Sequence, residues 1–208
     1  GVDNRFKAAV PVYGCGFLGD NSAWVDRLSK MTDDERNRWL ELWDPSQYLP
    51  AVSMPILFVN GTNDFAYPLD SYKKSYDLVP GEKRLRITVK MPHGHPPGWA
   101  PEEIGLFVDQ HLRDGISLPH IGPMAINDGR VQIVYQSDTK LTKAELHYTT
   151  GSEPVNMREW ETIQVKWNEA AVVFEVLPET ATAWFITVTD ERGAIVSGEV
   201  ILNEKSEN

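Results

Sequence analysis

The sequence has 208 residues, of which 41% are hydrophobic and 24% are charged, a composition typical of a globular protein that can bury a sizeable core. Its 20 lysines and arginines against 30 aspartates and glutamates give a net charge of −10, which argues against nucleic acid or an anionic membrane surface as a partner. No apolar run approaches the ~18 residues that cross a bilayer, and the single cysteine, Cys15, excludes an internal disulfide.

The first 115 residues alternate between strand and helix patterns. Residues 6–13 are mostly apolar, as a parallel strand buried on both faces would be. A polar insertion at about 20–48 follows, in which Thr32-Asp33-Asp34-Glu35 predicts a capping box at the start of a helix. Further elements are expected in the order strand, helix, strand, helix, at residues 54–59, 69–79, 85–91 and 101–112. This alternation predicts an α/β fold with a parallel sheet, whose ligands bind at the carboxyl ends of the strands.

After residue 115 the pattern changes to short strands of alternating polarity. Residues 116–129 carry Pro119, Gly122 and Pro123 and are interpreted as a linker. Six strands are expected beyond it, at residues 130–136, 143–149, 162–167, 171–176, 183–189 and 194–202. Regular short strands without an intervening helix pattern favour an all-β sandwich of immunoglobulin or fibronectin III shape over residues 130–203.

Two loops that follow expected strands carry candidate catalytic residues. Asp64 ends the turn at residues 60–64 after one strand, and His93 and His95 follow the next strand. An acid and then a histidine in this order are found in α/β-hydrolase triads, where the acid orients the imidazole and stabilises the imidazolium. We favour His95 as the base, because it stands where the strand has given way to an open loop, and keep His93 as the alternative. In a simpler interpretation, Asp64 only caps a tight turn and both histidines are surface residues.

The sequence contains no clear nucleophile for such a triad. Gly-x-Ser-x-Gly does not occur in the 208 residues. Cys15 follows an expected strand and precedes Asp64, but Tyr13 and Phe17 stand where a Gly-x-Cys-x-Gly elbow needs glycine. We therefore interpret Cys15 as a small buried residue and keep a nucleophilic role as the less favoured alternative.

The remaining histidines and tryptophans are interpreted as structural residues. A His93–His95 metal pair lacks a third ligand at zinc spacing, so neither a metal site nor a cofactor is expected. The histidines expected in a helix, the linker and a strand are His111, His120 and His147. Two groups of tryptophans are present: Trp24, Trp39 and Trp43 in the insertion, and Trp160, Trp167 and Trp184 in the β region. For both groups we favour a role in packing and keep contact with a ligand as the alternative. For the second group the alternative is a sugar-stacking platform.

Several of these segments resemble a known superfamily. The segments that carry the resemblance are Arg5–Val10, Tyr13-Gly14, Trp43–Ser46 with Tyr48, residues 55–64 and Met91–His95. They are similar to acetyl xylan esterase-like and dienelactone hydrolase-like α/β-hydrolases, and to PhoPQ-activated pathogenicity-related proteins, which also carry a trailing β domain. The resemblance covers residues 1–115 and implies the C-terminal part of a catalytic domain with a helical cap at about 20–48. In that family the nucleophile is a serine upstream of the first expected strand, so the resemblance implies a missing N-terminal half.

The resemblance also implies a function. It indicates a serine-type carboxylesterase that deacetylates a carbohydrate such as acetyl xylan, with Asp64 and His95 in its triad and a periplasmic or secreted location. The expected partners are an acylated small molecule or polysaccharide and the missing half of the domain, and the 208-residue chain alone is expected to be inactive. A prolyl-oligopeptidase-type serine peptidase has a similar layout of acid and histidine. A non-catalytic pseudo-esterase or binding module is the alternative from another class.

Overall fold

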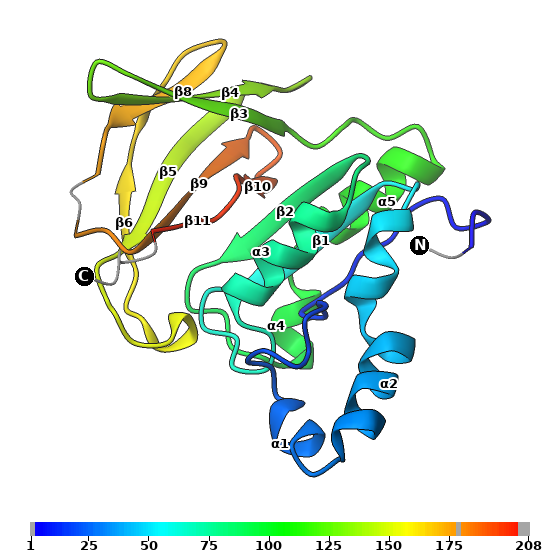
Figure 1. Cartoon of the computed structure of the whole chain (residues 1–208). Helices are drawn as coiled ribbons and strands as arrows, with labels where there is room; N and C mark the ends of the chain where they lie inside the picture. Colours follow the sequence, from blue (N-terminus) through cyan, green and yellow to red (C-terminus); the bar gives the residue numbers. More distant parts are fainter. Residues whose placement is uncertain (1–2, 178–179, 204–208) are drawn as a thin grey trace. The chain divides into compact units, whose positions relative to one another are not determined.

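The computed structural model describes residues 3–177 and 180–203. The protein has mixed α/β content, with more strand than helix, and its strands form two sheets (Figure 1). The chain divides into two compact units, one comprising residues 1–83 and 88–101 and the other residues 84–87 and 102–208. None of the helices in the described ranges combines the length and the apolar character that a membrane span requires.

The first unit contains the helices and strands that precede residue 102. Its elements are α1 (Val25–Leu28), α2 (Asp33–Trp43), η1 (Pro45–Gln47), η2 (Leu49–Ala51), β1 (Ile56–Gly61), α3 (Leu69–Leu78) and α4 (His95–Trp99). The strand β2 (Lys83–Thr88) has its two ends in this unit and its middle, Arg84–Ile87, in the second.

A chain segment near the N-terminus runs parallel to β1. Ala9 and Val12 form isolated parallel bridges with Ile56 and Val59. Pro11 lies between the bridges and has no backbone N–H to donate, so the predicted first strand forms two isolated bridges and no continuous ladder. Its backbone still bonds to the β1 segment on both sides of this gap, as in the bond from Tyr13 N to Val59 O at 2.8 Å.

Glu82, just before β2, and Thr88, its last residue, also hydrogen-bond the β1 segment in a parallel sense. Ile56 N donates to Glu82 O at 3.1 Å, and Thr62 N donates to Thr88 O at 3.0 Å. Since parallel strands end at the same edge, the turn that follows β1 lies near the loop that follows β2. This arrangement brings the two candidate catalytic loops together.

The helix α3 packs on β1 through aromatic side chains. Phe58 of β1 contacts the rings of Tyr72 and Tyr76, with centroids 5.6 Å away in both cases. Leu69, Tyr72, Tyr76 and Val79 are buried, which confirms the predicted apolar face of this helix.

The predicted capping box forms at the start of α2. The Thr32 side chain accepts from Glu35 N at 3.3 Å, and Thr32 N donates to Glu35 Oε2 at 2.9 Å. Trp24 packs on Trp39 of this helix with ring centroids 5.2 Å apart, whereas Trp43 is 67% exposed. The predicted packing role therefore fits Trp24 and Trp39 better than Trp43.

The described residues of the second unit form one α-helix and most of the strands. Its elements are α5 (Glu103–Leu112), β3 (His120–Asn127), β4 (Arg130–Gln136), β5 (Leu141–Thr149), η3 (Val155–Met157), β6 (Glu161–Gln164), β7 (Lys166–Trp167), β8 (Ala171–Glu175), β9 (Ala183–Asp190), β10 (Ile195–Ser197) and β11 (Ile201–Leu202). One sheet has the order β3-β4-β8-β7. In the other, β2, β10, β9, β5 and β6 lie in that order, and β11 pairs with β9.

The expected all-β sandwich is not confirmed, because the strands are distributed between the two sheets in a way that the expected boundaries do not match. β3 lies inside the expected linker, and the strand expected at 162–167 is split at Val165 into β6, which pairs with β5, and β7, which pairs with β8. The middle of β2 joins β10 through Leu85 opposite Ser197, and α5 belongs to the same unit. Polarity patterns locate strands along the chain but do not specify the sheet that each one joins.

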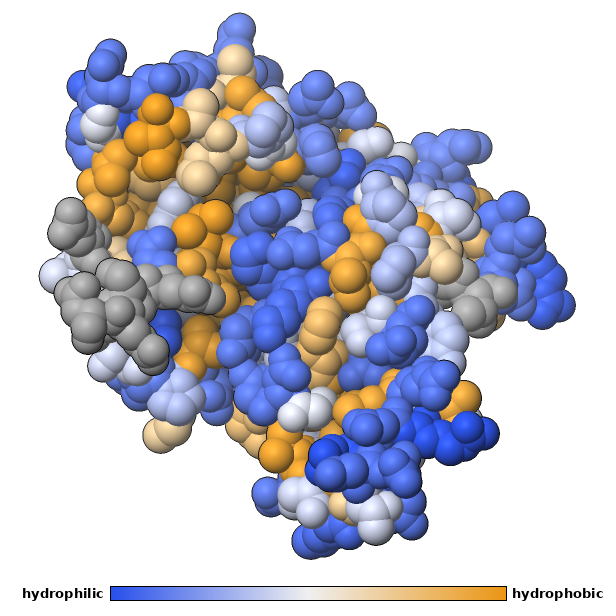
Figure 2. Space-filling view, viewed as in Figure 1, coloured by the Kyte–Doolittle hydropathy of each residue, from blue (hydrophilic) through white to orange (hydrophobic). Residues whose placement is uncertain are grey.

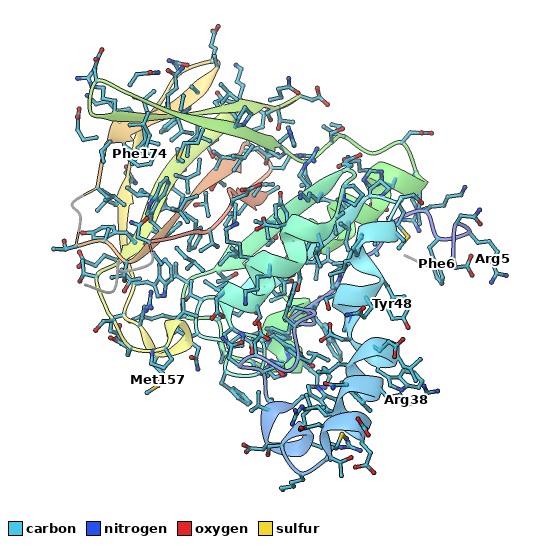
Figure 3. The ribbon with its side chains drawn as sticks, viewed as in Figure 1. Arg5, Phe6, Arg38, Tyr48, Met157 and Phe174 are labelled. Atoms are coloured by element: carbon cyan, nitrogen blue, oxygen red, sulfur yellow. The ribbon has the colours of Figure 1, made fainter. Side chains whose placement is uncertain are left out.

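Two tryptophans of the second unit are core residues. Trp160 and Trp184 are buried, and Trp184 packs edge-on against Phe174 of β8 with ring centroids 5.7 Å apart. Phe174 is labelled in Figure 3. Trp167 is 40% exposed.

Apolar side chains also line an open groove of about 610 Å³ that includes Ile163 and Phe174. Figure 2 shows apolar side chains reaching the protein surface among polar ones.

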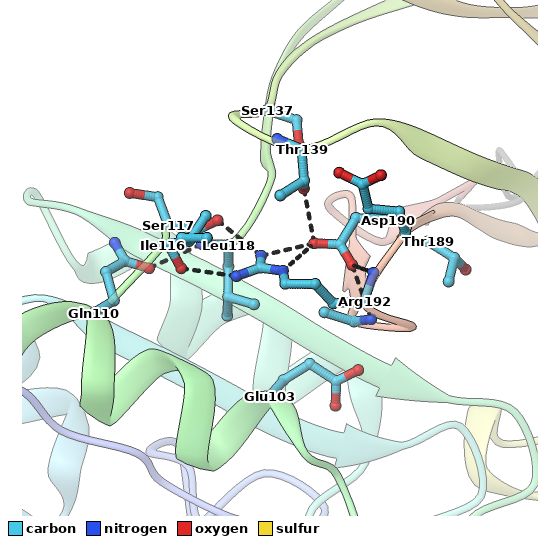
Figure 4. Close-up of polar contacts among 12 residues, drawn as sticks. Glu103, Gln110, Ile116, Ser117, Leu118, Ser137, Thr139, Thr189, Asp190 and Arg192 are labelled. Atoms are coloured by element: carbon cyan, nitrogen blue, oxygen red, sulfur yellow. Dashed lines mark hydrogen bonds and ion pairs between the residues drawn. The ribbon is translucent and has the colours of Figure 1, made fainter. Parts of the chain in front are cut away.

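An ion pair between the buried Asp190 and the partly exposed Arg192 closes the turn between β9 and β10 (Figure 4). Asp190 Oδ2 accepts from Arg192 Nε at 2.8 Å and from Thr139 Oγ1 at 3.0 Å. Arg192 also donates to the carbonyls of Ile116 and Ser117, at 2.9 Å each. Burial raises the pKa of Asp190, but the hydrogen bonds from Arg192 and Thr139 outweigh it and hold this pKa below its ordinary value. The pair therefore fixes the chain after α5 to the larger sheet of this unit.

Candidate functional site

Asp64 is held rigidly in the turn that follows β1. Its side chain has no accessible surface. One carboxylate oxygen, Oδ1, accepts from Ala66 N at 2.7 Å and from Tyr67 N at 2.9 Å. Asp64 thus caps its own turn, as the simpler interpretation expects, and this capping fixes the carboxylate in one orientation.

The same carboxylate contacts His93. Nδ1 of His93 lies 2.9 Å from Asp64 Oδ2 and 3.1 Å from Oδ1. An ionised carboxylate only accepts hydrogen bonds, so this contact requires the proton on Nδ1 and leaves Nε2 available to exchange a proton with another group. The His93 side chain keeps 31% of its surface accessible, so such a group can approach it.

His95 occupies a different position. It is exposed, it is the first residue of the short helix α4, and its ring lies 5.0 Å from that of Trp99. The preference for His95 assumed an open loop at this point, whereas a helix begins there. The structure therefore brings Asp64 together with His93, the alternative base, and not with His95.

Three aromatic rings surround His93. The ring of Tyr13 lies 4.5 Å from the imidazole, that of Phe65 lies 5.4 Å away and that of Tyr67 lies 6.0 Å away. Phe65 is itself 63% exposed. These residues come from two segments that are far apart in the sequence, and no spacing or motif indicates their proximity to His93.

A family model described as PhoPQ-activated pathogenicity-related protein matches residues 2–162, which is more than half of the chain. The chain belongs to this family. No match was found among curated proteins. Among solved structures, the crystal structure of a carbohydrate-binding module family 56 β-1,3-glucan binding domain is similar over 41% of this chain and 96% of that chain, with 16% identity and a TM-score of 0.28. That score is too low for the likeness to support an argument.

Cys15 of the PhoPQ-related chain is poorly suited to nucleophilic chemistry. It is 3% exposed, and burial raises the pKa of its thiol to about 12, despite a hydrogen bond with Ser75 that lowers it. Because the thiolate is the reactive form, a thiol of this kind stays protonated and inert near neutral pH. The geometry therefore supports the interpretation of Cys15 as a small core residue.

The other histidines of the PhoPQ-related chain lie outside this cluster. His111 packs on Phe107 at 4.6 Å, His120 is exposed on β3, and His147 is buried in β5. In the described part of the chain, no three or more His, Cys, Asp or Glu side chains are grouped so that they could hold a metal ion.

Proposed function

We propose that Asp64 and His93 are the acid and the base of a serine-type carboxylesterase. The observation that carries this proposal is the 2.9 Å contact of His93 Nδ1 with the buried Asp64 carboxylate. A buried acid that orients a partly exposed imidazole is the arrangement that acyl transfer by a nucleophile–base–acid triad requires.

The local topology supports an α/β-hydrolase fold for the first unit. Asp64 follows β1 and His93 follows β2, and the segments bonded to β1 run parallel to it. In such sheets, active-site residues gather where the strands end. The polar contact between the two loops is consistent with this position.

The proposed chemistry assigns each group a step. Nε2 of His93 takes the proton of a serine hydroxyl as the serine oxygen attacks the ester carbonyl, and it then gives that proton to the leaving alcohol. Asp64 stabilises the imidazolium between these two transfers. Water then hydrolyses the acyl-serine with His93 again as the base. Since Gly-x-Ser-x-Gly is absent from the 208 residues, we propose that the serine and the oxyanion-hole donors come from a segment outside them.

The proposed substrate is an acylated carbohydrate such as acetyl xylan. This choice rests on the resemblance of the Asp64 turn and the histidine loop to acetyl xylan esterase-like proteins. The exposed aromatic ring of Phe65 next to His93 is compatible with it, because aromatic faces are common contacts in ligand sites.

The test compares three variants in a gene product that includes the serine elbow. Hydrolysis of p-nitrophenyl acetate and release of acetate from acetylated xylo-oligosaccharides are measured for Asp64→Asn, His93→Ala and His95→Ala. We expect His93→Ala to lower kcat by about 10⁶-fold, since it removes the base, and Asp64→Asn to lower it by about 10⁴-fold, since it removes the group that holds the base in its tautomer. His95→Ala is the matched control and should change kcat by less than about tenfold, because it contacts Trp99 and not Asp64.

Each outcome bears on a separate part of the proposal. A large loss with His95→Ala and a small one with His93→Ala would overturn the assignment of the base. An elbow-containing protein that is inert toward both esters, or a gene product that lacks an elbow serine, would overturn the esterase and favour a non-catalytic protein. Activity on p-nitrophenyl acetate without release of acetate from the oligosaccharides would overturn only the substrate.

A further inference from the structure

We infer that Tyr13 is a positioning residue for His93. The hydroxyl and the ring of Tyr13 together hold the imidazole of His93 against Asp64. The inference deepens the proposed function, because it concerns how the proposed base keeps its proton on Nδ1. Tyr13 is distant from the histidine loop in the sequence, and it stands where a Gly-x-Cys-x-Gly elbow would need glycine, so no motif indicates this role.

The hydroxyl of Tyr13 fixes the backbone on both sides of His93. Its oxygen lies 3.0 Å from Pro92 O and 2.9 Å from Gly94 O. A hydroxyl carries one proton, which these two carbonyls can share as acceptors. One side chain thereby restrains the residues before and after His93, and with them the direction in which the imidazole leaves the backbone.

The ring of Tyr13 packs on the imidazole itself. The two centroids are 4.5 Å apart and the planes are tilted by 39°. On another part of the ring lies Gly98 of α4, where an added Cβ would stand 2.6 Å from Tyr13 Cε2. The tyrosine ring therefore fills the space between the imidazole and the helix that follows the histidine loop.

Tyr13 is in turn anchored to the strand that leads to Asp64. Tyr13 N donates to Val59 O of β1 at 2.8 Å, and the side chain is 7% exposed. Its backbone has φ of 64°, a left-handed conformation that is uncommon for a bulky residue and costs energy. The strained residue is thus the one whose ring contacts the imidazole of His93.

The hydroxyl is able to donate at any pH at which the enzyme would work. Burial raises the pKa of Tyr13 above its ordinary value and outweighs the hydrogen bond to Gly94, which lowers it, while the nearby Asp64 carboxylate raises it by the smallest of the three effects. The side chain thus keeps its proton and stays a donor to the two carbonyls.

The first experiment removes only the hydroxyl, in the 208-residue chain itself. Nitrogen NMR of the histidine rings reports the ratio of the Nδ1–H and Nε2–H tautomers of neutral His93. We expect Tyr13→Phe to raise the Nε2–H to Nδ1–H ratio about tenfold, the equivalent of one hydrogen bond, because the backbone at Pro92 and Gly94 is then no longer restrained and the imidazole is held less firmly against Asp64.

The matched control is Tyr72→Phe. Its hydroxyl also lies near two carbonyl oxygens, Val59 O at 2.9 Å and Pro11 O at 3.2 Å, and its side chain is buried. This variant loses a comparable pair of contacts without touching the histidine loop. Its stability should fall as that of Tyr13→Phe does, while the tautomer ratio of His93 should stay at the wild-type value.

A second variant keeps the inference testable if Tyr13→Phe fails to fold. Gly98→Ala leaves the hydroxyl intact and displaces the ring of Tyr13, and it should move the tautomer ratio in the same direction. An unchanged ratio in a folded Tyr13→Phe or Gly98→Ala protein would overturn the inference, and so would an equal change in Tyr72→Phe. None of these results depends on ester hydrolysis, so a failure here leaves the proposed function to be judged by the kinetics of His93→Ala.

Discussion

Replacement of His147 by glutamine should remove a pH-dependent part of the free energy of unfolding. His147 is buried in β5, with Nδ1 2.8 Å from Thr162 Oγ1 and Nε2 2.9 Å from Thr187 Oγ1. Its ring also stacks on Phe185 at 4.7 Å. Both ring nitrogens are satisfied by hydroxyls, which can donate or accept, so the cost of protonation comes mainly from placing a charge in the core.

The magnitude follows from the pKa of this histidine. Burial lowers the pKa of His147 from 6.5 to about 4. The smaller effects are those of Glu145, which raises this pKa, and then of Lys143 and Arg86, which lower it. The difference, 6.5 − 4 or about 2.5 in pKa, corresponds to about 3 kcal/mol at ~1.36 kcal/mol per unit of pKa. Because the folded-state pKa is the lower one, this stabilisation is complete above pH 6.5 and is lost progressively as the pH falls toward 4.

Urea unfolding of both proteins between pH 4 and 7.5 measures the effect, since the difference between the two curves cancels the contribution of the other titrating groups. Glutamine does not titrate in this range, so the destabilisation caused by His147→Gln should shrink by about 3 kcal/mol from pH 7 to pH 4. Parallel curves for the wild type and His147→Gln would refute the reasoning, because they would mean that the folded protein accepts the charge at no cost.

The remaining predictions concern stability at three other sites. An added Cβ at Gly61 would stand 2.2 Å from Met91 O, so Gly61→Ala should destabilise the protein by about 2 kcal/mol or more, and an unchanged urea midpoint would contradict the close approach. At Gly105, inside α5, an added Cβ meets nothing within 4 Å, so Gly105→Ala should stabilise by up to ~1 kcal/mol in the same assay. Thr32→Ala removes the capping box with Glu35 and should cost about 1 kcal/mol in thermal unfolding, whereas Thr32→Ser should retain most of it.

Local features of the fold could be predicted because they depend on neighbouring residues. The capping box at Thr32 requires only the four residues from the cap to Glu35, and the buried face of α3 follows from a helical repeat of apolar side chains. The strand expected at 130–136 coincides with β4, and the one expected at 183–189 differs from β9 by a single residue at its end. In each case hydrogen bonding or polarity within a short segment carries the information.

The candidate site could be predicted only in part for the same reason. The order of Asp64 and the histidine loop along the chain indicates an acid and a base, but both His93 and His95 satisfy that order. The choice depends on the direction of each side chain, and the start of α4 at His95 turns that residue toward Trp99 and leaves His93 on Asp64.

The sequence by itself therefore determined the kinds of elements, most of their positions and the two loops that carry the polar residues. The tertiary structure decided which histidine meets the carboxylate, which sheet each strand joins and how Tyr13 reaches His93. These three features depend on contacts between residues that are distant in the chain. A local pattern of polarity carries no information about which distant residues meet in space.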